Sequence, residues 1–132
     1  MAEVSWEEFL ADVRERGQYT TGREAERVAR IVLPALGGHL ADPERKELAE
    51  RLETPGSELL LDPAPATTPL GPRAFVETVA DLIEGATDET ARWDTGAVLT
   101  TLADLAGQAL LARVLVQLPS GYALLFGRAE LS

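Results

Sequence analysis

The sequence predicts an all-α protein, and three of its features carry that prediction. Apolar residues make up 45% of the chain and recur at three- and four-residue spacing, the pattern of helices buried on one face. Residue pairs typical of helix N-termini precede several of these stretches. The first half also returns in the second, 66 positions later. We therefore expect one domain, residues 1–132, in which two tandem copies of a three-helix unit pack about a pseudo-twofold axis into one helical bundle.

The predicted copies span residues 5–61 and 71–127. The stretch between them, residues 62–71, contains Pro63, Pro65 and Pro69. Proline fixes one backbone dihedral and removes an amide donor, so such a stretch favours an extended, semi-rigid chain. We interpret it as a linker between the copies.

The first copy opens with a capping box, in which a cap residue and an acid three positions later satisfy each other's backbone amides. Ser5 and Glu8 have this spacing and predict a helix start, and Gly17 predicts the end. Thr21 and Glu24 repeat the spacing ahead of the clearest amphipathic stretch in the chain. The apolar residues of that stretch are Ala25, Val28, Ala29, Val32, Leu33, Leu36 and Leu40.

The remainder of the first copy is more polar. Pro34 lies inside the amphipathic stretch and predicts a kink, because it removes one backbone hydrogen bond. Asp42 as cap and Pro43 in the first turn predict a third helix with charged outer faces. The segment 59–61 is a short apolar stretch ahead of the linker.

The second copy presents the same order of signals. Pro72 predicts a helix start, Thr87 predicts the cap of the next helix, and Gly107 precedes another. That last stretch, residues 109–118, is apolar almost all round, and a helix of this kind must be covered. We expect it to be either the central helix of the monomer or part of a homodimer surface. Residues 119–126 are expected to form a final short segment after it.

The residues that recur at a spacing of 66 occupy the apolar face or the cap of a predicted helix. All but one of the pairs are apolar and lie at helical spacing, and the exception is the threonine of a helix cap. The pairs are Phe9/Phe75, Val13/Val79, Thr21/Thr87, Ala25/Ala91, Val32/Val98, Leu33/Leu99, Leu36/Leu102, Leu52/Leu118 and Leu59/Leu125.

Several local patterns together resemble a known bacterial family, the domain of unknown function 2267. They are Phe9-Leu10-x-x-Val13, Glu24-Ala25-Glu26-Arg27 leading into Val32-Leu33-x-x-Leu36, Leu48-Ala49-x-x-Leu52, and Leu118-Pro119-x-x-Tyr122-x-x-Leu125-Phe126. The resemblance covers nearly the whole chain and implies a duplicated helical fold from a bacterium. It implies no activity, cofactor or catalytic residue. The chain departs from the pattern at Glu53, in its Pro-rich linker, and at Asp94, which stands where the first copy has Val28.

Composition excludes several classes of function. The net charge of −10 repels phosphate groups, so we expect neither nucleic acid nor a membrane as partner. The chain contains no cysteine, which excludes thiolate nucleophiles and cysteine-ligated metals. Its N-terminus is acidic, unlike a signal peptide, and the longest apolar runs are short of a membrane span, so we expect a cytoplasmic protein.

The residues that could carry chemistry are few. His39 is the only histidine, which excludes paired-histidine metal sites, and its place near a helix end favours a structural role. Asp94 falls on an apolar stripe beside Trp93. It is expected either to be buried, with Arg30 or Arg92 as its charge partner, or to turn into water. Trp93, Asp94 and Tyr122 form the candidate ligand-binding set, with no catalytic residue, metal or cofactor expected.

Arg23, Arg27 and Arg30 form a basic stripe opposite the apolar face of the second helix. This stripe is the candidate partner-binding surface, although such a stripe is more often solvated and paired with neighbouring acids of the same chain. The function that we predict is a non-enzymatic protein interaction or regulatory module, with a protein partner or a second copy of the chain in a homodimer. The alternative is a small-molecule-binding protein or enzyme with a pocket between the two repeats.

Overall fold

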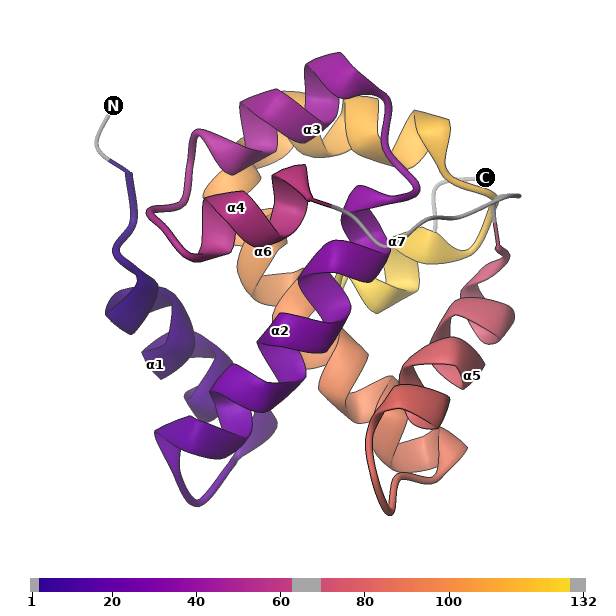
Figure 1. The fold of residues 1–132 in the computed structure, drawn as a ribbon. Helices are drawn as coiled ribbons and strands as arrows, with labels where there is room; N and C mark the ends of the chain where they lie inside the picture. The colour runs from indigo at the N-terminus through magenta and orange to yellow at the C-terminus, as the bar shows by residue number, and fades with distance from the viewer. Residues whose placement is uncertain (1–2, 63–69, 129–132) are drawn as a thin grey trace.

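A computed structural model of the chain describes residues 3–62 and 70–128, and within them the protein is all-α, as predicted (Figure 1). The helices are α1 (Trp6–Gly17), α2 (Gly22–Gly37), α3 (Asp42–Ala49), α4 (Gly56–Leu61), α5 (Pro72–Leu82), α6 (Asp88–Gln117) and α7 (Tyr122–Leu125). Val4 forms an isolated parallel bridge with Leu52, and the described residues contain no strand. Most of the predicted linker, residues 62–71, lies outside the described residues.

The predicted helix caps at Ser5, Thr21 and Thr87 are confirmed. The Ser5 hydroxyl accepts the amide of Glu8 at 3.1 Å, and the Thr21 hydroxyl accepts the amide of Glu24 at 3.3 Å. At the third cap the Thr87 hydroxyl accepts the Thr90 amide, and the Thr90 hydroxyl accepts the Thr87 amide. These bonds satisfy amides that would otherwise lack an intrahelical partner.

The start of α3 differs from the prediction. Ala41 occupies the cap position and Asp42 is the first helical residue, so the prediction that Asp42 is the cap is wrong. The Asp42 carboxylate forms an ion pair with Arg45, one turn along the helix. The backbone amide of Ala41 is instead satisfied from the other half of the chain, by the Gln117 side chain at 2.8 Å.

The short apolar segments predicted at the end of each copy are helical turns. Residues 59–61 lie in α4, so the described residues 3–62 contain four helices where the sequence predicted three. In the second half α7 occupies the predicted final segment, residues 119–126. Leu60 of α4 and Leu125 of α7 are buried, so both turns contribute to the core.

The helix α6 forms the centre of the fold. It crosses behind α2 in Figure 1 and contacts α1, α2, α3, α5 and α7. Its helical geometry breaks at Gly107, where φ is 79° and ψ is 166°. This region of backbone space is essentially restricted to glycine, so Gly107 allows the chain to change direction between two helical parts. The break expected before Leu110 is therefore present.

The second part of α6 is not the central helix of the monomer, so the first of the two alternatives is wrong, while a homodimer surface there stays a prediction. Leu110, Leu111 and Val114 are buried, but Ala109 and Ala112 are exposed, and Val116 is 85% exposed. The central position belongs instead to the first part of α6, residues 88–106. Sequence composition alone could not separate these two parts, because both are rich in alanine and leucine.

One continuous core joins the two halves of the chain, residues 3–62 and 70–128. Buried residues of α1 and α2, such as Phe9 and Leu33, belong to the same cluster as Phe75 and Leu99 from α5 and α6. By length and composition α6 is the one described helix that could span a membrane. Half of the 18-residue apolar stretch of α6 that meets this criterion is buried inside the fold. The core helix of a folded domain meets the same criterion.

Candidate functional site

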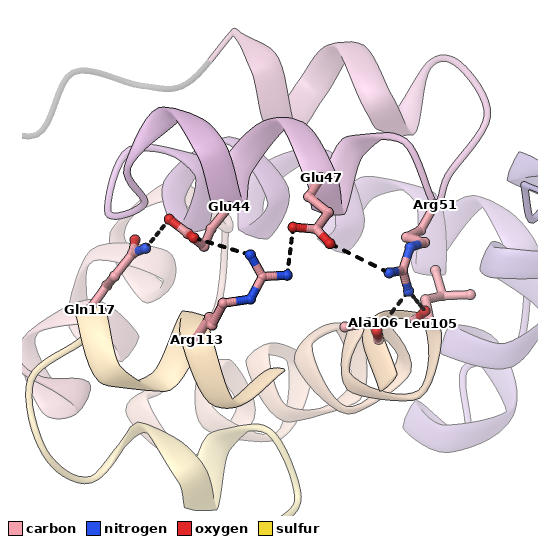
Figure 2. Close-up of polar contacts among 7 residues, drawn as sticks. All are labelled: Glu44, Glu47, Arg51, Leu105, Ala106, Arg113 and Gln117. Atoms are coloured by element: carbon pink, nitrogen blue, oxygen red, sulfur yellow. Dashed lines mark hydrogen bonds and ion pairs between the residues drawn. The ribbon is translucent and has the colours of Figure 1, made fainter. Parts of the chain in front are cut away.

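A polar clasp joins α3 to the second part of α6 (Figure 2). Arg113 on α6 donates to Glu44 at 3.5 Å and to Glu47 at 2.6 Å, both on α3. Gln117, one turn further along α6, donates to Glu44 as well. We define these four side chains, together with Arg51, as the clasp.

Arg51 closes the other end of the clasp, at the break in α6. Its guanidinium donates to the carbonyl oxygens of Leu105 at 3.1 Å and Ala106 at 2.7 Å, and it lies 3.9 Å from the carboxylate of Glu47. Because the helix breaks at Gly107, these two carbonyls have no partner one turn further on, and Arg51 supplies one. The clasp therefore closes the seam between the halves.

Trp93 lies beside the end of α1. Its ring Nε1–H donates to the carbonyl oxygen of Gly17 at 2.9 Å, while the side chain remains 55% exposed. Gly17 also accommodates the ring of Tyr19, because a Cβ atom at residue 17 would lie only 2.1 Å from that ring. Glycine at this position lets both aromatic rings approach the end of α1.

Asp94 is half-buried and pairs with Tyr19, a residue that the sequence analysis did not single out. The Tyr19 hydroxyl donates to the Asp94 carboxylate at 2.6 Å. Burial raises the pKa of Asp94 above its ordinary value, and the Tyr19 hydrogen bond and the nearby positive charge of Arg27 offset this only in part. Burial, reinforced by Asp94, likewise raises the pKa of Tyr19, so its hydroxyl keeps its proton and acts as donor.

The predicted charge partners of Asp94 were wrong. Arg30 pairs with Glu26 at 2.8 Å and lies over the ring of Trp6, and Arg92 is exposed. No sequence signal pointed to Tyr19, which follows α1 in a turn and meets Asp94 only through the fold.

A hollow of about 350 Å³ lies between the end of α1 and the first part of α6. Trp93 and Arg92 line it from α6, Arg16 lines it from α1, and Gly96 and Ala97 give it small walls. Arg16 forms an ion pair with Asp104, which also pairs with Arg128 at 3.1 Å. Burial acts to raise the pKa of Asp104, but the guanidiniums of Arg128 and Arg16 outweigh it and hold the pKa below its usual range.

Tyr122 belongs to a different cluster from Trp93 and Asp94. It is buried, and its hydroxyl donates to the carbonyl oxygen of Leu70 at 2.7 Å. Its ring meets Phe75 edge-on and lies against His39. Of the predicted ligand-binding set, Trp93 therefore lines the hollow, its neighbour Asp94 bonds Tyr19 and is not in that lining, and Tyr122 lies in the core.

The predicted basic stripe is divided among different roles. Arg23 and Arg27 are exposed, but Arg27 acts electrostatically on Asp94, and Arg30 is held by Glu26. Intramolecular pairing thus accounts for part of the stripe.

A family model described as "Uncharacterized conserved protein (DUF2267)" matches residues 6–125. The chain belongs to the DUF2267 family. Comparison with curated proteins gives no match. The family description carries no activity, so any function must be argued from the site.

Two features of the described part of this DUF2267 chain bear on catalysis: the contacts of its histidine and the placement of its potential metal ligands. Both ring nitrogens of His39 are engaged: Nδ1 bonds to the carbonyl of Ala35 at 2.9 Å, and Nε2 accepts the amide of Leu70 at 3.1 Å. A histidine bound in this way is not free to act as a general base. Among the described residues, no group of three potential ligand side chains is placed to hold a metal ion.

The Asp94→Asn variant of the DUF2267 chain is expected to be more stable than the natural chain at neutral pH. The fold raises the pKa of Asp94 and so disfavours its charged form, whereas asparagine is neutral and can still accept from Tyr19. As the pH falls through the raised pKa, the natural carboxyl takes up a proton and the advantage of asparagine disappears. Urea denaturation at several pH values between about 7 and about 4 measures this difference in the free energy of unfolding.

The control for this prediction is Asp104→Asn. Because the two arginines lower the pKa of Asp104, its charge stabilises the fold, and this variant should be less stable than the natural chain at neutral pH. That deficit is lost as the pH falls through the lowered pKa. An Asp94→Asn variant that is less stable than the natural chain at neutral pH would contradict the statement that the fold disfavours the charged form of Asp94.

Proposed function

We propose that this protein is a non-enzymatic, cytoplasmic interaction module and that Trp93 anchors its docking surface. One observation carries the proposal: the indole ring is 55% exposed, yet its Nε1–H bond to Gly17 fixes its position. A large ring left half in water contributes little to folding, but a fixed ring loses little entropy on binding. Tryptophan and arginine are also the residues that dominate binding free energies at interfaces.

The hollow beside Trp93 supports a partner of particular chemistry. Arg92 and Arg16 line the hollow with the single carboxylate of Glu89, and Arg16 shares its partner Asp104 with Arg128, so arginines outnumber acids around the hollow. Gly96 and Ala97 leave room for a side chain of the partner to approach α6. A segment that combines acidic residues with one apolar side chain fits both features.

Selection of binding peptides from a displayed random library tests this proposal. The selected peptides should contain acidic and apolar residues and should bind Trp93→Ala at least about tenfold more weakly than the natural chain. Val116→Ala is the matched control, because it removes an exposed apolar side chain from another part of α6 and should leave binding unchanged. Peptides that bind the Trp93→Ala variant as tightly as the natural chain would overturn the proposal.

A small molecule in the same hollow is the second candidate. The volume of about 350 Å³ falls within the range of ligand pockets, and the lining combines an aromatic ring with charged groups. In a thermal-shift screen of small molecules, a ligand of this hollow would stabilise the natural chain but not the Trp93→Ala variant.

We also propose that the two halves are copies related by a pseudo-twofold axis. Helices α1, α2 and α4 begin at residues 6, 22 and 56, and their counterparts α5, α6 and α7 begin at residues 72, 88 and 122, each 66 positions later. Glu47 also pairs with Arg113, its own counterpart at that spacing. Contacts between equivalent positions are expected where a twofold axis passes.

The rest of the clasp supports the same symmetry. Arg51 reaches the backbone of residues 105–106, just before the second part of α6. Its counterpart at the same spacing, Gln117, reaches the backbone amide of Ala41, just before α3. Each side chain thus bonds the backbone just before the equivalent helix in the other half. The Gln117 contact at Ala41 lies one position from Leu40, the counterpart of Ala106, so the pair approaches the reciprocity of an isologous contact.

A further inference from the structure

A second surface, separate from the hollow beside Trp93, is a groove between α1 and α2. The two helices contact each other where they cross at the lower left of Figure 1, and the open groove along them has a volume of about 640 Å³. Leu10, Ala11 and Tyr19 give its lining an apolar character, and Glu7, Glu15 and Glu26 lie around them. The groove is therefore apolar in part and acidic at its rim.

The acidic rim is only partly neutralised. Glu26 pairs with Arg30, but Glu7 and Glu15 are exposed and form no ion pair within the described residues. Arg14, the one basic residue that lines the groove, donates to the backbone carbonyls of Tyr19 and Thr20 in the turn that follows α1. Its charge is thus held at one end of the groove.

The apolar wall of the groove is fixed in place. The Tyr19 ring packs directly on Gly17, and its hydroxyl is held by Asp94 on α6. A partner would therefore meet a preformed surface and would not have to order it, which favours affinity. Since α1 has 12 residues, rising about 1.5 Å each, the groove matches about three turns of a helix.

We infer that this groove binds a basic amphipathic helix of another protein. An apolar face flanked by lysine or arginine would cover Leu10 and Tyr19 and meet Glu7 and Glu15 at the rim, as in other helix-in-groove complexes. A second copy of this chain fits poorly, because its net charge is −10. Phosphate-bearing partners are repelled for the same reason.

Three synthetic helical peptides of about four turns test the inference. They share one leucine face and carry lysine, glutamine or glutamate on the other, and fluorescence anisotropy measures their binding to the full chain. The lysine peptide should bind at least about tenfold more tightly than the glutamine peptide, and the glutamate peptide most weakly. Raising the salt to about 0.5 M should reduce the difference, because the charges at the rim are exposed.

Two double variants separate a specific groove from general attraction to an acidic protein. Glu7→Gln with Glu15→Gln should weaken the lysine peptide about tenfold, while Glu77→Gln with Asp81→Asn removes the same charge from exposed positions on α5 and should have little effect. Trp93→Ala should leave this binding unchanged, so the two proposed surfaces are tested independently. Equal weakening by both double variants, or equal binding of the lysine and glutamine peptides, would overturn the inference.

Discussion

Expressed as separate pieces, residues 1–62 and residues 70–132 are each expected to lack a cooperative thermal transition. Each half buries its apolar faces on the other: α2 packs on α5 and α6, and α6 packs on α1 and α3. Leu33 and Leu36 of α2 are completely buried in this shared core. A domain of about 60 residues buries only about 60% of the surface that its unfolded chain exposes, less than a larger domain does, and loss of the other half would expose apolar surface that is now covered.

Circular dichroism during heating measures this expectation. Each piece alone should lose its helix content gradually or have little at the start, whereas an equimolar mixture should recover a cooperative transition because the clasp and core can form between the pieces. The intact chain is the control. A single half that melts cooperatively as a monomer would show that the core is divisible, contrary to the structure described above.

The features that the sequence predicted well are local. The cap residue Thr21 and the Glu24 amide that donates to it lie within one turn, and the apolar stripe of α2 needs only helical spacing, so both can be recognised from neighbouring residues. The misplaced cap of α3 shows the limit. Asp42 is of a residue type that is favoured at helix N-caps, but Ala41 is the cap residue. The backbone amide of Ala41 donates to the side chain of Gln117, which lies 76 positions further along the chain.

The candidate site was predicted only in part for the same reason. Trp93 and Asp94 stood out because a charged residue interrupts an apolar stripe, and the structure gives both of them hydrogen-bond partners in the first half of the chain. Tyr19 carries no such signal, since an aromatic residue in a turn is ordinary. Tyr122 was grouped with the pair by residue type, but folding places its hydroxyl on the Leu70 carbonyl.

The second prediction of large effect concerns the aromatic cluster that joins α5 to the first half. Phe75 is 1% exposed, and its ring meets His39 at 5.3 Å and Tyr122 at 5.7 Å between centroids, both edge-on. Phe75→Ala is expected to lower the free energy of unfolding by about 3–5 kcal/mol, because it leaves a cavity and removes both ring contacts. Urea denaturation followed by circular dichroism measures the loss.

A loss of this size approaches the total stability of a small domain, so a smaller change in the same place is needed as well. Phe75→Leu keeps most of the apolar volume and should fold, with a loss clearly below that of alanine, because only the ring contacts and part of the packing disappear. Leu82→Ala on the same helix is the matched control: Leu82 is 59% exposed, and its truncation should cost about 0.5 kcal/mol or less. Equal destabilisation by Phe75→Ala and Leu82→Ala would contradict this prediction. The ring of Phe75 would then not be the contact that holds α5 against His39, and other residues would have to join the two halves of the core.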